Sequence, residues 1–327
     1  MSVTYIDAIH DAQKDLLAED KDVFLYGQDI GVFGGAFKAT KGLKELFPDR
    51  VIDAPISEDA MAGMVTGAAV MGKKPIMEVQ FADFSTIAFN QIVNMAATHY
   101  YRTGIPANIT VRLPCGGTPG TGPFHSQSLE ALFAHYPGLH VMTPATVADA
   151  YWMLRQAVEV PDPVIFLEHK FLYRWLKAED NYREAPVIPF GMARIARTGK
   201  HATVVAYSAM VPEAVRAADL LAKESGGPPH GAPAGHGHRH RLRSAHWPRP
   251  GRRGRLPVGG RHVGSRFPHR GGRLPSAGRS APAAQRQGHP HPPASQPVEG
   301  APPYAGIHRR LHPPSFIHLI QPSFHHA

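Results

Sequence analysis

The sequence predicts an α/β fold with a mainly parallel sheet over its first 225 residues, and two observations predict it. Short runs rich in β-branched and other apolar residues alternate with longer stretches that carry apolar side chains at helical spacing. Strands that alternate with helices of roughly 10–15 residues form βαβ units, whose helices cover both faces of the sheet. The 327 residues of the chain are enough for two domains.

The expected elements follow one another closely along residues 1–176. The first helix is expected over residues 6–17, where Ile6, Ile9 and Leu16 fall on one side. The further expected strands are 22–26, 50–54, 74–81, 108–113, 140–143 and 163–169, and the further expected helices are 59–71, 85–101 and 147–158. Together they predict one α/β domain over residues 1–176.

A second α/β unit is expected to begin after a polar linker over residues 177–200. Residues 201–208 have the pattern of a strand and residues 211–223 that of an amphipathic helix. The strand that should follow does not come, because the composition changes at Gly226. We therefore expect residues 201–225 to be a truncated second α/β domain.

The net charge of +9 is distributed very unevenly. Residues 226–327 hold 15 Arg, no Lys and a single acidic residue, Glu299, so this segment carries +14 and residues 1–225 carry −5. The segment is also rich in Gly, Pro and His and has few large apolar side chains to offset the entropy of ordering it. The sequence predicts a disordered basic tail over residues 226–327.

Three interpretations of this tail compete. It could be a nucleic-acid-binding arm, or it could bind a metal ion through His236, His238 and His240. It could also be the out-of-frame reading of a GC-rich gene, that is, a frameshift product. The lack of Lys and the break inside a domain favour the frameshift and make nucleic acid an unfavoured partner.

Other classes are excluded by simple features. A single cysteine, Cys115, rules out a disulfide framework and a cysteine-built zinc site, and it fits a reducing compartment. No run approaches the ~18 apolar residues of a membrane span, and the polar first residues are no signal peptide. We therefore expect a cytoplasmic protein without a membrane contact. The chain also lacks the P-loop and G-x-S-x-G patterns.

The candidate site residues each allow a simpler explanation when taken alone. Glu58 stands where a strand gives way to a helix, a position that the helix dipole favours for any carboxylate. His125 closes the glycine loop 116–122 and could be a hydrogen-bonded loop histidine, while Phe81 and Phe84 could be core residues. Loops after parallel strands are nevertheless where α/β folds bind ligands.

Taken together, these residues form a specific set of motifs. They are GQDIG (27–31), PISE (55–58), EVQFADF (78–84), FHSQS (124–128), HYPGL (135–139) and PVIFLE (163–168). Over residues 1–223 the chain resembles the β subunit of the thiamine-diphosphate-dependent, decarboxylating first component of 2-oxo acid dehydrogenase complexes. The resemblance implies a transketolase pyrimidine-type domain that binds thiamine diphosphate.

The resemblance also implies roles for the site residues. Glu58 would hydrogen-bond the aminopyrimidine N1′ of the cofactor and so promote its activation, with Phe84, and Phe81 beside it, packing at the cofactor. His125 would handle protons during acyl transfer to lipoamide. A structural potassium ion would be held largely through backbone carbonyls. Its implied ligands are Ile109, Ala157, Val158, Val160 and Asp162.

The partners follow from the same resemblance. The chain has no Gly-Asp-Gly motif for Mg²⁺ and diphosphate, so a separate α subunit would hold Mg²⁺ in an α₂β₂ heterotetramer. The lipoyl domain of the acyltransferase component and a small 2-oxo acid complete the expected partners. Residues 81–84 and 172–174 favour branched-chain substrates over pyruvate or acetoin. The alternatives from other classes are a non-catalytic assembly subunit and a basic nucleic-acid-binding protein.

Overall fold

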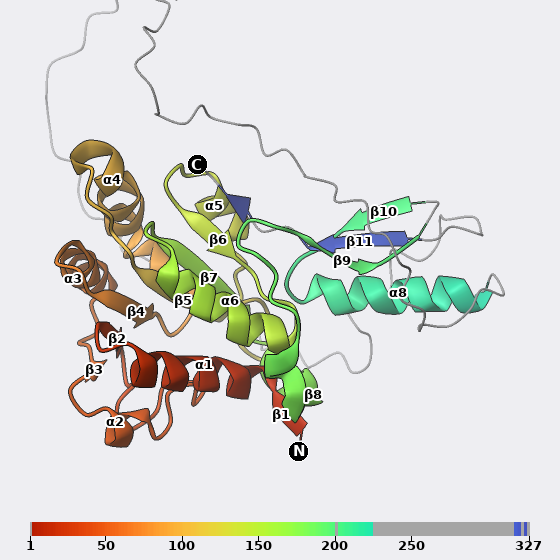
Figure 1. The fold of residues 1–327 in the computed structure, drawn as a ribbon, viewed down its shortest axis with the longest axis horizontal. Coiled ribbons are helices and arrows are strands. Elements are labelled where there is room, and N and C mark those ends of the chain that lie inside the picture. The colour runs from red at the N-terminus through yellow and green to blue at the C-terminus, as the bar shows by residue number, and fades with distance from the viewer. Residues whose placement is uncertain (1, 200–201, 225–316, 322–323, 326–327) are drawn as a thin grey trace, which may run out of the picture. The chain divides into compact units, whose positions relative to one another are not determined.

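The structure is a computed structural model that describes residues 2–199, 202–224, 317–321 and 324–325 (Figure 1). Its strands and helices alternate along the chain as expected from the sequence. The strands are β1 (Ser2–Thr4), β2 (Val23–Gly27), β3 (Val51–Asp53), β4 (Lys74–Glu78), β5 (Thr110–Cys115), β6 (His140–Met142), β7 (Val164–His169), β8 (Lys177–Glu179), β9 (Arg194–Arg197), β10 (Ala202–Val205), β11 (Ile317–Gln321) and β12 (Phe324–His325). The α-helices are α1 (Tyr5–Glu19), α2 (Leu43–Leu46), α3 (Glu58–Val70), α4 (Ala97–Thr103), α5 (Glu130–Ala134), α6 (Val147–Glu159), α7 (Leu172–Trp175) and α8 (Met210–Glu224).

The central sheet has the strand order β12-β6-β7-β5-β4-β2-β3. Its six strands from β6 to β3 are parallel to their neighbours, and β12 joins β6 in antiparallel orientation. The predicted mainly parallel sheet is therefore confirmed. Because all six strands run the same way, their carboxyl ends share one edge of the sheet.

Helices cover both faces of the sheet (Figure 1). Along β7, Val164 and Phe166 belong to the core that includes α1 and α6, whereas Ile165 and Leu167 belong to the core that includes α3 and α5. Side chains of a strand alternate between its two faces, and all four of these are apolar and buried. Such continuous apolar strands are typical of a parallel sheet that is buried on both sides.

Local sequence explains where the longer helices begin. Thr4 and Asp7 form a capping box at the start of α1, in which the Thr4 hydroxyl accepts from the backbone N–H of Asp7 and the Asp7 carboxylate accepts from that of Thr4. Thr146 caps α6 in a similar way, since its side chain accepts from the N–H of Asp149 at 3.0 Å. Both caps satisfy amides that have no partner inside the helix.

The expected helix over 85–101 and the expected strand over 74–81 have different boundaries in the structure. The strand β4 already ends at Glu78, and a 3₁₀ helix, η1 (Ala82–Thr86), follows it. Ser85 and Thr86 donate their hydroxyls to the carbonyls of Ala82 and Asp83, at 2.5 and 2.9 Å, which competes with helical pairing. A longer helical stretch begins at residue 89 and contains a π-helical segment, η2 (Gln91–Ala96), before α4.

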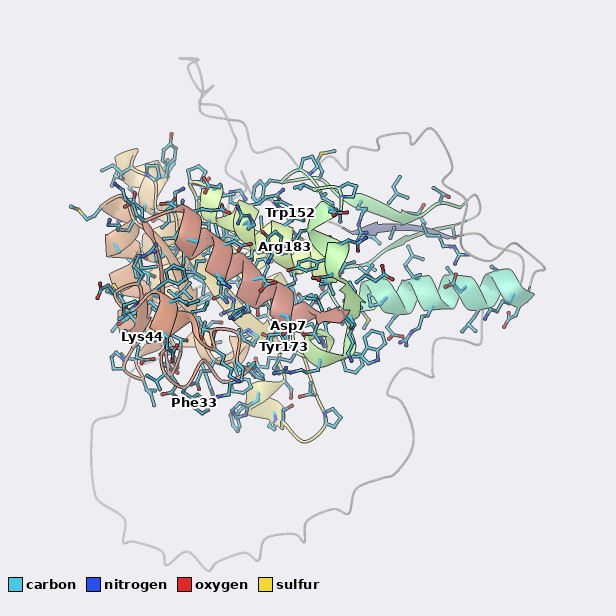
Figure 2. All side chains as sticks on the ribbon, turned by 60° about the horizontal axis from the view of Figure 1, so that its bottom comes forward. Asp7, Phe33, Lys44, Trp152, Tyr173 and Arg183 are labelled. Atoms are coloured by element: carbon cyan, nitrogen blue, oxygen red, sulfur yellow. The ribbon has the colours of Figure 1, made fainter. Side chains whose placement is uncertain are left out.

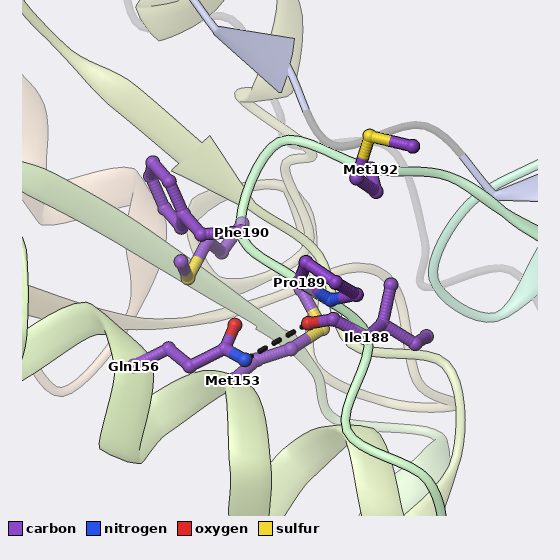
Figure 3. A pocket seen from close by; sticks show the side chains of 7 residues that line it. Met153, Gln156, Ile188, Pro189, Phe190 and Met192 are labelled. Atoms are coloured by element: carbon purple, nitrogen blue, oxygen red, sulfur yellow. Dashed lines mark hydrogen bonds between the residues drawn. The ribbon is translucent and has the colours of Figure 1, made fainter. Parts of the chain in front are cut away.

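The expected linker over 177–200 contains regular structure. The strand β8 pairs antiparallel with β1, and a 3₁₀ helix, η4 (Asp180–Glu184), follows. Arg183, labelled in Figure 2, contacts the carboxylates of Asp11 and Asp15 on α1 at 2.9 and 3.0 Å. Figure 3 shows the next contact, in which Gln156 Nε2 donates to the carbonyl of Ile188 at 2.9 Å. The linker is therefore fixed to α1 and α6.

The second unit shows the expected strand and helix as β10 and α8. The strand β11 lies between β10 and β9 in a separate three-stranded sheet, and β12 extends the central sheet. Both strands belong to the tail over 226–327. The rest of that tail, with His236, His238 and His240, lies outside the described residues. The boundaries at 176, 200 and 225 remain predictions.

No helix in the described part of the chain is long and apolar enough to cross a membrane.

Candidate active site

The predicted catalytic and cofactor-binding residues lie along the carboxyl edge of the central sheet. Glu58 follows β3, Gln28 follows β2, and Phe81 follows β4. The loop that begins at Gly116 follows β5, and Lys170 follows β7. These strands are neighbours in the order β3-β2-β4-β5-β7, so the segments that follow them line one continuous edge.

Glu58 is the first residue of α3 and is only 4% exposed. Gln28 Nε2 donates to its Oε1 at 3.1 Å and also approaches Met61 Sδ at 3.7 Å. This is the one hydrogen bond that the described residues give the Glu58 carboxylate. A carboxylate at a helix N-terminus interacts favourably with the helix dipole.

Phe81, Phe84 and His125 form an aromatic cluster. The His125 ring lies edge-on to Phe81, with centroids 4.3 Å apart, and edge-on to Phe84 at 5.5 Å. The two phenylalanine rings are 5.9 Å apart and also meet edge to face. The structure therefore brings these three predicted residues together. Among the described residues, no hydrogen bond or ring contact joins this cluster to Glu58.

The loop 116–127, which contains the glycine loop 116–122 and His125, is closed at its base by backbone and side-chain contacts. The Gly116 N–H donates to the Gln127 carbonyl at 2.9 Å. Asp83 Oδ1 accepts from the N–H groups of Ser126 and Gln127 at 3.3 Å each, and Lys170 Nζ donates to the carbonyl of His125 at 2.9 Å. Sequence reasoning missed Asp83 and Lys170, because both act on the backbone and not on a recognisable side-chain partner.

Gly116 is needed where the loop leaves β5. Its φ is +78°, and a Cβ at this position would lie 2.1 Å from Nε2 of His169. Burial lowers the pKa of His169 to about 4, so that ring stays neutral, and its Nδ1 accepts from the N–H of Phe171 at 3.3 Å. The ring is thus held against Gly116.

We expect Gly116→Ala to lower the free energy of unfolding more than Gly120→Ala does. Both glycines have positive φ, which costs an L residue about 1–2 kcal/mol, but a Cβ at Gly120 would meet nothing within 4 Å. The clash with His169 should add about 1–3 kcal/mol at Gly116. Urea unfolding followed by circular dichroism checks this, and equal costs for the two variants would show that the His169 contact is not tight.

A buried charged triad lies under the site on β4, β5 and β7. Arg112 makes two parallel hydrogen bonds to Glu168, from Nε to Oε1 at 2.6 Å and from Nη2 to Oε2 at 2.8 Å. Its Nη1 donates to the carboxylate of Glu78. All three side chains are at most 3% exposed. Burial disfavours the guanidinium charge, but the carboxylates of Glu168 and Glu78 outweigh it and raise the pKa of Arg112.

Burial and the charge of Arg112 act in opposite directions on the pKa of Glu78. Burial raises the pKa of the Glu78 carboxyl, and Arg112 counteracts that effect. Tyr173 completes the group by donating its hydroxyl to Glu168 at 2.7 Å. A signal for this triad was present in the sequence, because a charged residue inside an apolar strand, such as Arg112 or Glu168, indicates a buried partner.

The residues expected to hold potassium lie where α6 ends and β5 begins. Three of their carbonyls already accept a hydrogen bond. Val164 N donates to the carbonyl of Ile109 at 2.8 Å, and Asn108 Nδ2 donates to that of Val158 at 2.8 Å. The carbonyl of Ala157 accepts from Val160 N at 3.3 Å. Each carbonyl keeps a second lone pair. The Asp162 carboxylate is 3.4 Å from His140 Nε2. In the described ranges, no group of three or more His, Cys, Asp or Glu could hold a metal ion.

Comparison with known proteins defines the class of this fold and site. The family model described as "Transketolase, pyrimidine binding domain" matches residues 1–175. A solved structure titled "Split gene transketolase, inactive beta4 tetramer" aligns with a TM-score of 0.55 at 23% identity and covers 68% of each chain. At that identity the solved structure supports the fold alone. The first α/β domain is thus a transketolase-type pyrimidine-binding domain.

Curated relatives narrow the class further. The chain is 46% identical over 231 residues to the 2-oxoisovalerate dehydrogenase subunit beta of Bacillus subtilis (strain 168), covering 68% of this chain and 69% of that protein. It is 39% identical over 225 residues to the pyruvate dehydrogenase E1 component subunit beta of Staphylococcus epidermidis (strain ATCC 35984), with the same coverage. It is 40% identical over 226 residues to the 3-methyl-2-oxobutanoate dehydrogenase subunit beta of Mycobacterium tuberculosis (strain H37Rv), covering 68% of this chain and 64% of that one.

This chain belongs to the family of β subunits of thiamine-diphosphate-dependent 2-oxo acid dehydrogenases. The predicted family and the predicted fold class are therefore confirmed, and the resemblance is confined to a segment of about 225–231 residues.

Proposed function

We propose that this chain supplies the aminopyrimidine half of a thiamine diphosphate site in a 2-oxo acid dehydrogenase that acylates lipoamide. The observation that carries the proposal is the Glu58 carboxylate. It is nearly buried at the start of α3, and Gln28 is its one hydrogen-bond donor among the described residues. A carboxylate held in this way can bind a protonated ring nitrogen.

The residues present fit such a cofactor. Gln28 occupies Oε1 of Glu58, so the other carboxylate oxygen can accept a hydrogen bond from the aminopyrimidine N1′. Phe84, at the same sheet edge, offers a partly buried ring on which a planar heterocycle can pack. Bound thiamine diphosphate would supply a carbon nucleophile and an electron sink for decarboxylation.

The protein's own groups would then have separate tasks. Glu58 would hold a proton at N1′, because a carboxylate can share that proton and an amide cannot. His125 would exchange a proton with the acyl acceptor, which we take to be the lipoyl domain of an acyltransferase. Phe81 would keep the His125 ring in place, since the two ring centroids are 4.3 Å apart.

The rest of the site would come from a partner subunit. An α subunit would contribute Mg²⁺ and the diphosphate half in an α₂β₂ heterotetramer, because this chain contains no Gly-Asp-Gly motif. A potassium ion at Ile109, Ala157, Val158, Val160 and Asp162 is part of the proposal, supported by the hydrogen bond from Asn108 to the Val158 carbonyl, which brings the end of α6 beside the start of β5. So is a cytoplasmic location, supported by the single, buried Cys115.

Branched-chain 2-oxo acids are the proposed substrates, and a relative at 46% identity that is named for 2-oxoisovalerate supports them. We expect the chain, co-expressed with the α subunit of its own genome, to turn over 3-methyl-2-oxobutanoate with a kcat/KM at least about tenfold above that for pyruvate, since each methylene in an apolar pocket is worth ~10-fold or more. Steady-state assays on the purified complex measure this ratio.

Pyruvate is the second candidate substrate, because a pyruvate dehydrogenase subunit is similar at 39% identity. A higher kcat/KM for pyruvate than for 3-methyl-2-oxobutanoate would identify pyruvate as the substrate and overturn the branched-chain preference. A complex without turnover of either acid would contradict the proposed dehydrogenase itself.

A further inference from the structure

Two buried charged side chains, Asp83 and Lys170, hold the loop 116–127, which carries His125, from two sides. Asp83 Oδ1 accepts from the N–H groups of Ser126 and Gln127, which follow His125 directly. Lys170 Nζ donates to the carbonyl of His125 at 2.9 Å and to that of Gly116 at 2.5 Å. The residue that carries the imidazole is thus fixed at its own carbonyl and at the two amides that come after it.

The arrangement is costly for a simple loop closure. Asp83 and Lys170 are each only 6% exposed. Burial lowers the pKa of Lys170, which means that its charged form is disfavoured there. In addition, Oδ2 of Asp83 is buried without a hydrogen-bond partner among the described residues. Proteins accept such local costs mainly where the position of a group matters for function.

The imidazole itself depends on the same contacts. Lys170 Nζ lies 5.5 Å from the centroid of the Phe81 ring, and that ring meets His125 edge to face at 4.3 Å. Lys170 therefore acts on His125 twice, through its backbone carbonyl and through the ring on which the imidazole packs. No hydrogen bond within the described ranges links Asp83 or Lys170 to the His125 ring nitrogens.

We propose that Asp83 and Lys170 are positioning residues, which hold the His125 imidazole at the edge of the site without touching the substrate. This inference rests on the proposed function, because it assigns His125 to proton exchange with the acyl acceptor. Loss of either residue should free the loop while the sheet and Glu58 keep their places.

The first test measures the loop directly in the full chain. We expect Lys170→Met and Asp83→Ala to speed amide hydrogen exchange in residues 116–127 at least about tenfold, the factor that one lost hydrogen bond produces. Lys44→Met is the matched control, since Lys44 Nζ also donates to two carbonyls, of Pro48 and Val51, at 2.6 and 2.9 Å. Unchanged exchange in both site variants would overturn the proposal.

The second test separates positioning from folding in the complex with the α subunit. We expect Lys170→Met and Asp83→Ala to slow acylation of a free lipoyl domain at least about tenfold, while decarboxylation followed with an artificial electron acceptor changes less than about twofold. Asp83→Asn, which keeps a carbonyl acceptor for the two amides, should lie between wild type and Asp83→Ala. Equal loss of both reactions, or loss of neither, would overturn the proposal.

Glu58→Gln distinguishes this inference from the proposed function. If Glu58→Gln abolishes both reactions while the Lys170 and Asp83 variants behave like wild type, only the positioning role is wrong. If Glu58→Gln leaves both reactions intact, the proposed function is wrong.

Discussion

Glu58→Gln is expected to lower kcat for 2-oxo acid decarboxylation by roughly two to four orders of magnitude, the range that a positioned acid–base group contributes. In the wild type, Gln28 Nε2 donates to Oε1 of Glu58 at 3.1 Å. Glutamine at position 58 keeps the size of the side chain and an oxygen that can accept this hydrogen bond. It cannot take part in holding a proton at the cofactor ring. The fold and the assembly with an α subunit should remain, as circular dichroism and size-exclusion chromatography would show.

Asp59→Asn is the matched control for this prediction. Asp59 also lies in the first turn of α3 and there accepts from Gln91 Nε2 at 3.4 Å. Both substitutions remove a favourable interaction with the helix dipole of about 0.3–1 kcal/mol, but only Glu58 should affect the rate. Similar kinetics for the two variants would mean that Glu58 serves the helix and not the chemistry.

Arg112→Leu is expected to lower the free energy of unfolding by about 3–5 kcal/mol, because it leaves Glu78 and Glu168 buried without their positive partner. That is a large part of the total stability of a typical domain, about 5–15 kcal/mol. Arg155→Leu serves as the control, since Arg155 pairs with the exposed Glu19 and should cost about 1 kcal/mol or less. Urea unfolding of both variants gives the two values.

A combined variant tests the cause of this loss. When Glu78→Gln and Glu168→Gln are already present, Arg112→Leu should cost clearly less than it costs in the wild type, because no uncompensated carboxylate is left behind. If Arg112→Leu lowers the free energy of unfolding by the same amount in both backgrounds, lost packing and not buried charge is responsible.

The sequence was sufficient to predict the sheet and its helices because their signals are periodic. Apolar runs such as that of β7 and helical stripes such as that of α6 repeat over many residues. The π-helical segment η2 was not predictable, since its buried residues Ile92, Val93 and Ala96 also fit the period of an ordinary α-helix.

Predictability within the site depended on the kind of contact. Glu58 could be placed at a helix N-terminus because the transition from strand to helix is visible in the sequence. The closure of the His125 loop by Asp83 and Lys170 was not visible, because both side chains bind backbone groups 43 to 45 residues away along the chain. Because nearly all residue types offer the same backbone N–H and carbonyl groups, the sequence does not reveal which residues are bound in this way.

Cofactor binding tests the central claim, that this chain supplies one half of a thiamine diphosphate site, most directly. Isothermal titration with thiamine diphosphate and Mg²⁺ should show no saturable binding to the chain alone. The same titration of the chain together with its α subunit should show one cofactor bound per αβ pair, and Glu58→Gln should weaken that binding. Saturable binding of one cofactor to the isolated chain would contradict the account.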